Sequence, residues 1–255
     1  MGKAVYFASD FHLGVPDYET SLKREKKVIA WLDSIKDDAE RIFLMGDVFD
    51  FWFEYKHVVP KYYVRLLGKL AELSDSGIQI DFFTGNHDMW AFDYLTREIG
   101  IPVHRKPLQL TIQGKQFYIG HGDGLGPGDY GFKFIKKVFA NPVCQWLFAR
   151  LHPNFGIGMA NFWSRKSRSA NPAVEKFESE QNEWLLTWCR EYISASPEIN
   201  FFVFGHRHLP LNLEVVPGTR YFNLGDWFTW CSYLRVENGV PELLYFRNEN
   251  SEPVK

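Results

Sequence analysis

The chain has 255 residues, and its composition, 45% hydrophobic and 24% charged, is that of a globular protein and excludes an intrinsically disordered one. A chain of this length can bury a large core, so we expect one α/β domain with an insertion. The formal net charge of -2 gives no global positive field, so we expect no nucleic-acid partner.

The N-terminal part of the chain alternates apolar strands with amphipathic helices. We predict helices over 19–36 and 61–74, and strands over 4–9 (AVYFAS), 41–46 (RIFLMG) and 78–84 (IQIDFFT). This β-α-β-α-β order is typical of a parallel sheet covered by helices.

The rest of the chain predicts two further hairpins and a long helical insertion. Residues 108–120 read as a hairpin that turns at Gln113-Gly114, and the β-rich end of the chain has a second turn at Asn238-Gly239. The helical stretch is broken at three prolines, in Asn141-Pro142, His152-Pro153 and Asn171-Pro172. We therefore predict a core formed by residues 1–129 and 196–255, with a helical cap insertion at 130–195.

Leader, anchor and disulfide signals are missing from the sequence. The N-terminus lacks the basic start and cleavage site of a signal peptide, and no apolar run reaches the roughly 18–20 residues that cross a bilayer. The cysteines Cys144, Cys189 and Cys231 have no CxxC spacing, which indicates reduced thiols. We expect a cytoplasmic protein.

Five short polar segments each follow an apolar run that ends at a loop. They are Asp10-x-His12, Gly46-Asp47-x-x-Asp50, Gly85-Asn86-His87-Asp88, His121-Gly122-Asp123 and Gly205-His206-Arg207-His208. Ligand sites in α/β sheets are built at strand ends, and glycine lets the backbone turn sharply there. Each segment alone is common by chance, whereas all five in this order indicate one shared site. His57, His104 and His152 lie outside the pattern, and we interpret them as structural or surface residues.

The residue types of these segments indicate metal binding. Carboxylates, imidazoles and one carboxamide form a mixed oxygen and nitrogen ligand set without thiolate, which suits Mn²⁺, Fe or Zn²⁺ better than a structural zinc site. Two such metals about 3.5–4 Å apart can share a carboxylate and a hydroxide that attacks phosphorus. The sequence therefore predicts a two-metal phosphoesterase.

The order DxH, GDxxD, GNHD, HGD, GHxH resembles the calcineurin-like metallophosphoesterases over nearly the whole chain outside the insertion. The resemblance implies a β-sandwich flanked by helices and two divalent metal ions, most simply Mn²⁺, with Fe or Zn²⁺ as alternatives. It implies that one ion takes Asp10, His12 and His208, that the other takes Asn86, His121 and His206, and that Asp47 bridges both.

The resemblance also assigns roles to the residues beside these ligands. His87 and Asp88 match the family's His-Asp dyad, in which His87 acts on the phosphate or the leaving oxygen and Asp88 holds its orientation. Asp50 matches a partner of a ligand histidine more closely than a ligand.

The flanks FASDFHLG, GDVFDFWF, HGDGLGPGD and FNLGDW resemble the UDP-2,3-diacylglucosamine pyrophosphatases of Gram-negative lipid A synthesis. That resemblance implies hydrolysis of UDP-2,3-diacylglucosamine to UMP and 2,3-diacylglucosamine 1-phosphate, with the insertion holding the acyl chains. Some members have Arg at the position of His87, so this chain resembles a His-bearing branch. The resemblance implies substrate contacts by Asn86 and Asp129.

The insertion is rich in aromatic residues with interleaved Lys and Arg, and two interpretations remain open. One is a packed helical subdomain with solvated basic faces. The other is an apolar chamber that holds acyl tails and rests on an anionic inner-membrane surface. In the second, Phe139, Trp146 and Phe162 face the metal cleft. Arg165, Lys166 and Arg168 then lie near the entrance or the phosphates.

Two alternative functions also remain. One is a metallophosphoesterase that acts on a soluble nucleotide or phosphodiester. The other is a non-catalytic scaffold of the same fold, which the complete set of ligand positions disfavours. The sequence does not predict an oligomeric state.

Overall fold

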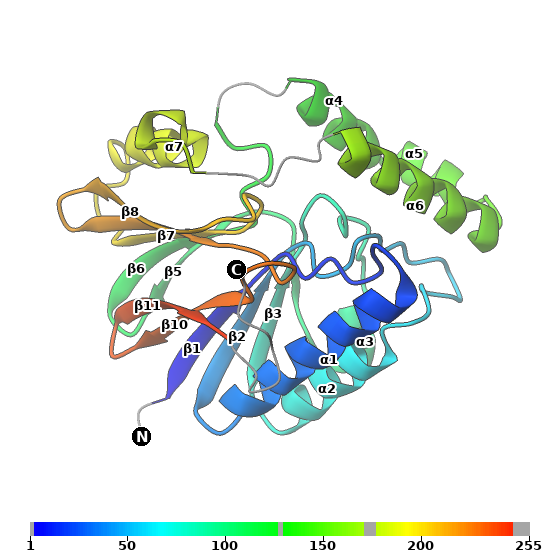
Figure 1. The fold of residues 1–255 in the computed structure, drawn as a ribbon, viewed down its shortest axis with the longest axis horizontal. Coiled ribbons are helices and arrows are strands. Elements are labelled where there is room, and N and C mark those ends of the chain that lie inside the picture. Colours follow the sequence, from blue (N-terminus) through cyan, green and yellow to red (C-terminus); the bar gives the residue numbers. More distant parts are fainter. Residues whose placement is uncertain (1–2, 127–129, 171–176, 247–255) are drawn as a thin grey trace.

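The structure, a computed structural model, describes residues 3–126, 130–170 and 177–246 (Figure 1). Its first sheet has the order β11-β10-β1-β2-β3-β4. Strands β1 (Ala4–Ala8), β2 (Ala39–Met45), β3 (Gln79–Phe83) and β4 (Val103–His104) run parallel to one another. β10 (Ser232–Glu237) joins β1 in antiparallel fashion, and β11 (Val240–Tyr245) pairs antiparallel with β10.

The second sheet has the order β5-β6-β7-β9-β8. Its strands are β5 (Leu108–Ile112), β6 (Lys115–Ile119), β7 (Phe201–Phe204), β8 (Pro210–Val216) and β9 (Thr219–Leu224). The hairpin turns predicted at Gln113-Gly114 and Asn238-Gly239 are confirmed, and all four residues have the positive φ that a type I′ turn requires.

The two sheets pack face to face, and alternate residues of each strand divide between two cores. In β1, Val5 and Phe7 point to the core between the sheets, whereas Ala4 and Tyr6 point to the core under the helices. Phe7 stacks on Phe43 of β2 with ring centroids 4.7 Å apart. Parallel strands are covered on both faces, so nearly all of their side chains are apolar. This explains the continuous apolar runs in the sequence.

Helices cover both outer faces of the sandwich (Figure 1). Helices α1 (Tyr18–Ile35), α2 (Val64–Asp75) and α3 (Tyr94–Ile99) pack on the first sheet. α7 (Trp184–Ile193), which follows a short 3-10 turn at Glu180–Asn182, packs on the second sheet. The predicted α/β sandwich flanked by helices is confirmed.

The insertion helices α4 (Tyr130–Phe139), α5 (Pro142–Phe148) and α6 (Pro153–Ala170) form a separate group (Figure 1). The predicted breaks at Pro142 and Pro153 are confirmed, whereas the break at Asn171-Pro172 lies outside the described residues. α7 lies inside the predicted insertion of 130–195, but it packs on the second sheet. The structure thus sets α4–α6 apart from α7, and the division into core and cap stays a prediction.

The insertion helices contact the loops that follow β2 and β3. The Phe148 ring lies 4.7 Å from that of Phe53 and 4.8 Å from that of Trp90. Trp90 Nε1 donates a hydrogen bond of 2.8 Å to the carbonyl oxygen of Phe139. Across the described ranges, no helix is both long and apolar enough to cross a membrane.

A buried carboxylate ties three strands of the first sheet together at Asp81 of β3. Its two oxygens lie 2.7 Å from Arg41 Nε of β2 and 2.7 Å from His104 Nε2 of β4. Burial raises the pKa of Asp81, but the hydrogen bonds from His104 and Arg41 outweigh that effect and hold the pKa below its ordinary value. His104 is therefore structural, as predicted.

We expect Asp81→Asn to lower the free energy of unfolding by about 1–3 kcal/mol at pH 7, because it weakens two charge-assisted hydrogen bonds of a buried group. The folded-state pKa lies below the ordinary 3.8, so the contribution is complete above pH 3.8 and is lost as the pH falls through the folded value. Urea titrations at several pH values, with the exposed Asp75→Asn as control, measure this. If the free energies of unfolding of the variant and the wild type differ by the same amount at pH 7 and at pH 2.5, the stabilising role of the Asp81 carboxylate is contradicted.

Candidate metal centre

Ten polar side chains from five strand-end loops meet at one edge of the sandwich. Asp10 and His12 follow β1, Asp47 and Asp50 follow β2, Asn86, His87 and Asp88 follow β3, His121 follows β6, and His206 and His208 follow β7. Three groups of these side chains have ligand atoms within 4.8 Å of one another: Asp10 with His12 and His208, Asp47 with His121 and His206, and Asp47 with His12 and His87. Asp47 and His12 therefore join the groups into one site.

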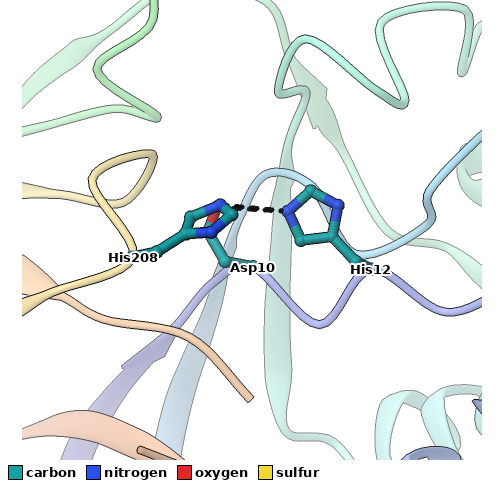
Figure 2. A group of neighbouring side chains, drawn as sticks. All are labelled: Asp10, His12 and His208. Carbon is teal, nitrogen blue, oxygen red and sulfur yellow. Dashed lines mark hydrogen bonds and ion pairs between the residues drawn. The ribbon is translucent and has the colours of Figure 1, made fainter. Parts of the chain in front are cut away.

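The first group brings two imidazoles and a carboxylate together (Figure 2). His12 Nε2 lies 3.2 Å from His208 Nε2, and Asp10 Oδ1 lies 3.2 Å from His208 Nε2 and 3.7 Å from His12 Nε2. Two facing imidazole nitrogens at this distance present two lone pairs or compete for one proton. A shared cation removes that conflict, so the arrangement fits a metal ion.

The second group is centred on Asp47. Asp47 Oδ2 lies 3.3 Å from His121 Nε2 and 3.7 Å from His12 Nε2, so one oxygen faces both groups. Asp47 Oδ1 accepts a hydrogen bond of 2.8 Å from the backbone N–H of His87. This bond fixes the carboxylate and leaves Oδ2 for the space between the groups.

The backbone of these loops adopts a conformation that most residues avoid. Asp10, His12, Asp47, His206 and His208 all have φ between 42° and 71°. Asp and His tolerate this left-handed region better than most residues, yet it still costs roughly 1–3 kcal/mol at each position. This backbone conformation directs five side chains into the same site.

Three glycines make room for side chains of the site. A Cβ at Gly205 would lie 2.6 Å from Asp10 Oδ2, and a Cβ at Gly46 would lie 2.6 Å from His121 Nδ1. Gly85 is equally confined, because its Cβ would meet the side chain of Asp47. The glycines that precede Asp47, Asn86 and His206 are therefore required by close approach.

Three buried polar atoms of the site lack a hydrogen bond, namely Asp10 Oδ1, Asn86 Oδ1 and His121 Nε2. Leaving buried polar atoms unpaired costs about 1–3 kcal/mol each, so almost all such atoms in native structures have a partner. All three can donate an electron pair to a metal ion. The donor set and the unpaired atoms together fit divalent metals at this position.

The electrostatics of the site also favour positive charge. Burial lowers the pKa of His12, but the neighbouring carboxylates of Asp10 and Asp50 outweigh it and raise the pKa to about 10. Burial likewise opposes the rise at His121, where the charge of Asp47 brings the pKa to about 10. Without a metal, protons therefore supply the positive charge beside these carboxylates, and a metal ion has to displace them.

Two other histidines have the opposite tendency. Burial, with the charge of His121 next in size, lowers the pKa of His206 to about 4. Burial also lowers the pKa of His87. Neutral imidazole is the form that binds metal or accepts a proton.

The structure corrects the predicted role of Asp88. Its carboxylate accepts hydrogen bonds from the backbone N–H groups of Gly85 at 2.7 Å, Val48 at 2.8 Å and Phe49 at 3.3 Å. His87 is oriented instead by the carbonyl oxygen of Asp50, which lies 2.9 Å from His87 Nδ1. Asp88 stabilises the loops after β2 and β3, because the path of the chain at the turn directs its carboxylate toward backbone N–H groups. Burial, followed by the charge of Asp47, raises its pKa to about 7.

The predicted substrate contacts are placed only in part. Asn86 has its side-chain oxygen in the site. Asp129 lies outside the described residues, and so do the side chains of Arg165, Lys166 and Arg168 on α6. Of the aromatics predicted to face the cleft, Phe139 packs on Trp90, whereas Trp146 and Phe162 are exposed.

A cavity of about 710 Å³ opens beside His121, between the ends of β3 and β4, the loop after β6, and α4. Its walls carry the cations Arg105, Lys106, Lys133, Lys136 and Lys137, and one carboxylate, Asp123. Lys136 pairs with Asp123 at 2.5 Å. The remaining excess of positive charge suits a phosphate-bearing ligand.

A buried ion pair that the sequence did not indicate holds the GHRH loop. Glu183, which directly precedes α7, lies 3.1 Å from Arg207 Nε, and the Tyr221 hydroxyl lies 3.5 Å from the same carboxylate. Asn223 donates from its side chain to the carbonyl oxygen of Gly205. In the sequence, Arg207 is marked only by its place between the candidate ligands His206 and His208. Its partners could not be predicted, because they come from other elements of the fold.

No family model matches the chain. A protein of Porphyromonas gingivalis named UDP-2,3-diacylglucosamine hydrolase is 39% identical over 246 residues, which cover 91% of this chain and 94% of that protein. Proteins of the same name from Edwardsiella ictaluri (25% over 243 residues, 92% and 88% covered) and Shewanella sp. (24% over 234 residues, 90% and 91% covered) are more distant. Among solved structures, a predicted phosphoesterase of Streptococcus pneumoniae aligns over 96% of this chain and 98% of its own with a TM-score of 0.42 and 13% identity.

The similarity to the Porphyromonas gingivalis protein covers more than nine tenths of both chains. This chain therefore belongs to the family of the UDP-2,3-diacylglucosamine hydrolases.

Proposed function

We propose that the protein is a metal-dependent hydrolase that cleaves the pyrophosphate of UDP-2,3-diacylglucosamine to UMP and 2,3-diacylglucosamine 1-phosphate. The main support for this substrate is the 39% identity, over 91% of the chain, to a protein named UDP-2,3-diacylglucosamine hydrolase. The hydrolytic chemistry is supported by the joined side-chain groups around Asp47.

One metal ion is held by Asp10, His12 and His208, the other by Asn86, His121 and His206, and Asp47 bridges both. The hydrogen bonds of two rings support this assignment. His121 Nδ1 lies 2.8 Å from the carbonyl oxygen of Met45, which only accepts, so Nδ1 carries the proton and Nε2 presents its lone pair. His12 Nδ1 lies 3.3 Å from Asp50 Oδ1, which leaves His12 Nε2 for metal in the same way.

The ligand set without thiolate favours Mn²⁺, with Fe or Zn²⁺ as alternatives. When bound, divalent ions polarise phosphoryl oxygens and lower the pKa of water. The contribution of His87 is separate. Its Nδ1 donates to the Asp50 carbonyl, so Nε2 is the atom available to the phosphate or the leaving oxygen.

The insertion helices supply the surface for the lipid part of the substrate. Their apolar side chains are unusually exposed: Phe134, Ile135, Val143, Trp146, Leu147, Phe155 and Phe162 are each at least half exposed. Arg150 lies over the Trp146 ring at 4.7 Å, and Lys137 is exposed nearby in sequence. Exposed aromatics with cations suit acyl chains and an anionic bilayer, so we propose that the protein works at the inner-membrane surface.

Purified enzyme with Mn²⁺ is expected to release UMP from UDP-2,3-diacylglucosamine. Replacing the exposed Trp146 and Phe162 by Ser should lower that turnover by about tenfold or more, since each buried CH₂ contributes about 0.8 kcal/mol. Hydrolysis of a soluble aryl phosphodiester should be unchanged, because it needs only the metal centre. Thermal unfolding controls for folding.

Wild-type enzyme that cleaves the aryl ester and leaves the lipid intact would instead favour a soluble phosphoester as substrate. Equal loss of both activities in well-folded variants contradicts the role of the exposed aromatics.

Asp47→Ala is expected to lose both metal ions together, because its carboxylate is the shared ligand. Asp10→Ala should lose chiefly one. Elemental analysis after gel filtration measures the metal content, and the exposed Asp37→Ala is the matched control. Two equivalents of metal in folded Asp47→Ala would overturn the bridging role.

His87→Ala is expected to keep its metal ions and to lose about 10²–10⁴-fold in turnover, the usual range for a positioned acid or base. The exposed His57→Ala serves as control. Loss of metal from His87→Ala would make His87 a ligand and refute the proposed role.

A further inference from the structure

Asp50 is a junction between the metal centre and helix α6. Its backbone N–H donates to the carbonyl oxygen of Leu13 at 2.9 Å, which joins the loop after β2 to the loop after β1. Its carbonyl oxygen accepts from His87 Nδ1, and its Oδ1 lies beside His12 Nδ1. The side chain is only 2% exposed, so these contacts are shielded from water.

The second oxygen of the Asp50 carboxylate faces the insertion. The Ser164 hydroxyl on α6 donates a hydrogen bond of 2.9 Å to Asp50 Oδ2. Ser164 and Asp50 are 114 positions apart in the chain, so this bond forms only when α6 is docked on the loop after β2. The Phe148 contact with Phe53 holds the same loop from α5.

Donors from the insertion and from the metal centre help to orient this carboxylate. The Ser164 O–H donates to Oδ2, whereas His12 Nδ1 at 3.3 Å and His87 Nδ1 at 3.6 Å face Oδ1, so loss of the Ser164 bond removes one of the contacts that hold the carboxylate in place. The ring of His12 then loses its fixed acceptor. Partners that orient a metal-binding histidine in this way usually contribute 10–100-fold to metal affinity or activity.

We propose that Ser164 is a positioning residue that couples docking of α6 to the geometry of the metal centre. It acts through the Asp50 carboxylate on His12, and the Asp50 main chain carries the same constraint to His87. Helix α6 therefore helps to position the metal-binding side chains, in addition to forming part of the lipid-binding surface. The proposal rests on the metal-ligand assignment made under the proposed function.

Metal affinity is the first readout, because it needs no substrate. Metal-free protein is titrated with Mn²⁺, and the free ion is followed by electron paramagnetic resonance. We expect Ser164→Ala to weaken Mn²⁺ binding about tenfold, and Ser164→Thr, which keeps the hydroxyl, to restore most of it. Ser34→Ala is the matched control, since Ser34 is also a helical serine with a hydrogen-bonded hydroxyl, on α1.

A double-variant comparison tests whether Ser164 acts through Asp50. Asp50→Asn alone should weaken Mn²⁺ binding, and adding Ser164→Ala should cost little more, because the acceptor is already changed. Additive losses in the double variant would overturn the coupling. Wild-type affinity in folded Ser164→Ala would overturn the proposal as a whole.

Turnover separates this inference from the proposed function. At saturating Mn²⁺, the kcat of Ser164→Ala on an aryl phosphodiester should stay reduced, because His87 is displaced even when the metals are bound. An unchanged kcat at saturating Mn²⁺ contradicts the extension to His87. If the wild type fails to cleave the lipid substrate, the substrate assignment falls, while the Mn²⁺ titration still decides the role of Ser164.

Discussion

Two buried carboxylates impose the main constraint on this structure. Asp10 and Asp47 are 0% and 1% exposed, and burial of an uncompensated carboxylate costs several kcal/mol. Burial raises the pKa of both groups, but neighbouring histidines, His12 and His208 for Asp10 and His121 for Asp47, hold both pKa values below their ordinary range. The fold therefore has to supply positive charge at the strand ends, and divalent metal ions bound there would supply more of it than imidazolium protons do.

Most other features of the site serve this charge arrangement. The left-handed backbone at five positions directs the side chains inward, and the confined glycines allow the carboxylates to approach the neighbouring loops. Backbone carbonyls of β2 and its loop hold the rings of His121 and His87 through Nδ1. The acceptor for His121 belongs to β2 itself, and the acceptor for His87 lies in the loop that follows it, so the framework of the sandwich sets the orientation of both rings.

The sequence predicted the parts of this arrangement that depend on local pattern. Strand positions, both hairpin turns and the breaks at Pro142 and Pro153 follow from periodicity and turn chemistry. The five loops share one edge because parallel strands end together. Contacts set by the three-dimensional path of the chain were not accessible. Asp88 turns toward backbone donors, and Glu183 reaches Arg207 from the start of α7. Nothing in the local sequence distinguishes these carboxylates from solvated ones.

The boundary of the insertion shows the same limit. α7 is as helical in pattern as α4–α6, and only the buried contacts of Leu185, Leu186 and Cys189 with the second sheet separate it from them. Helical periodicity reports that one face is apolar, but it does not report which surface covers that face. For α4–α6 the covering surface in the described residues is small, which is why their aromatics are exposed.

The core and the insertion therefore differ in the interactions that stabilise them. The core is fixed by two sheets and three apolar clusters, whereas α4–α6 meet the strand-end loops through the Phe148 and Phe139 contacts and the Ser164–Asp50 hydrogen bond. A ligand can shift such an arrangement only by its difference in affinity for the docked and undocked states. A substrate with phosphates at the metal centre and acyl chains on α4–α6 touches both parts at once. Its binding energy therefore favours the docked state, which is also the state in which Asp50 receives the bond from Ser164.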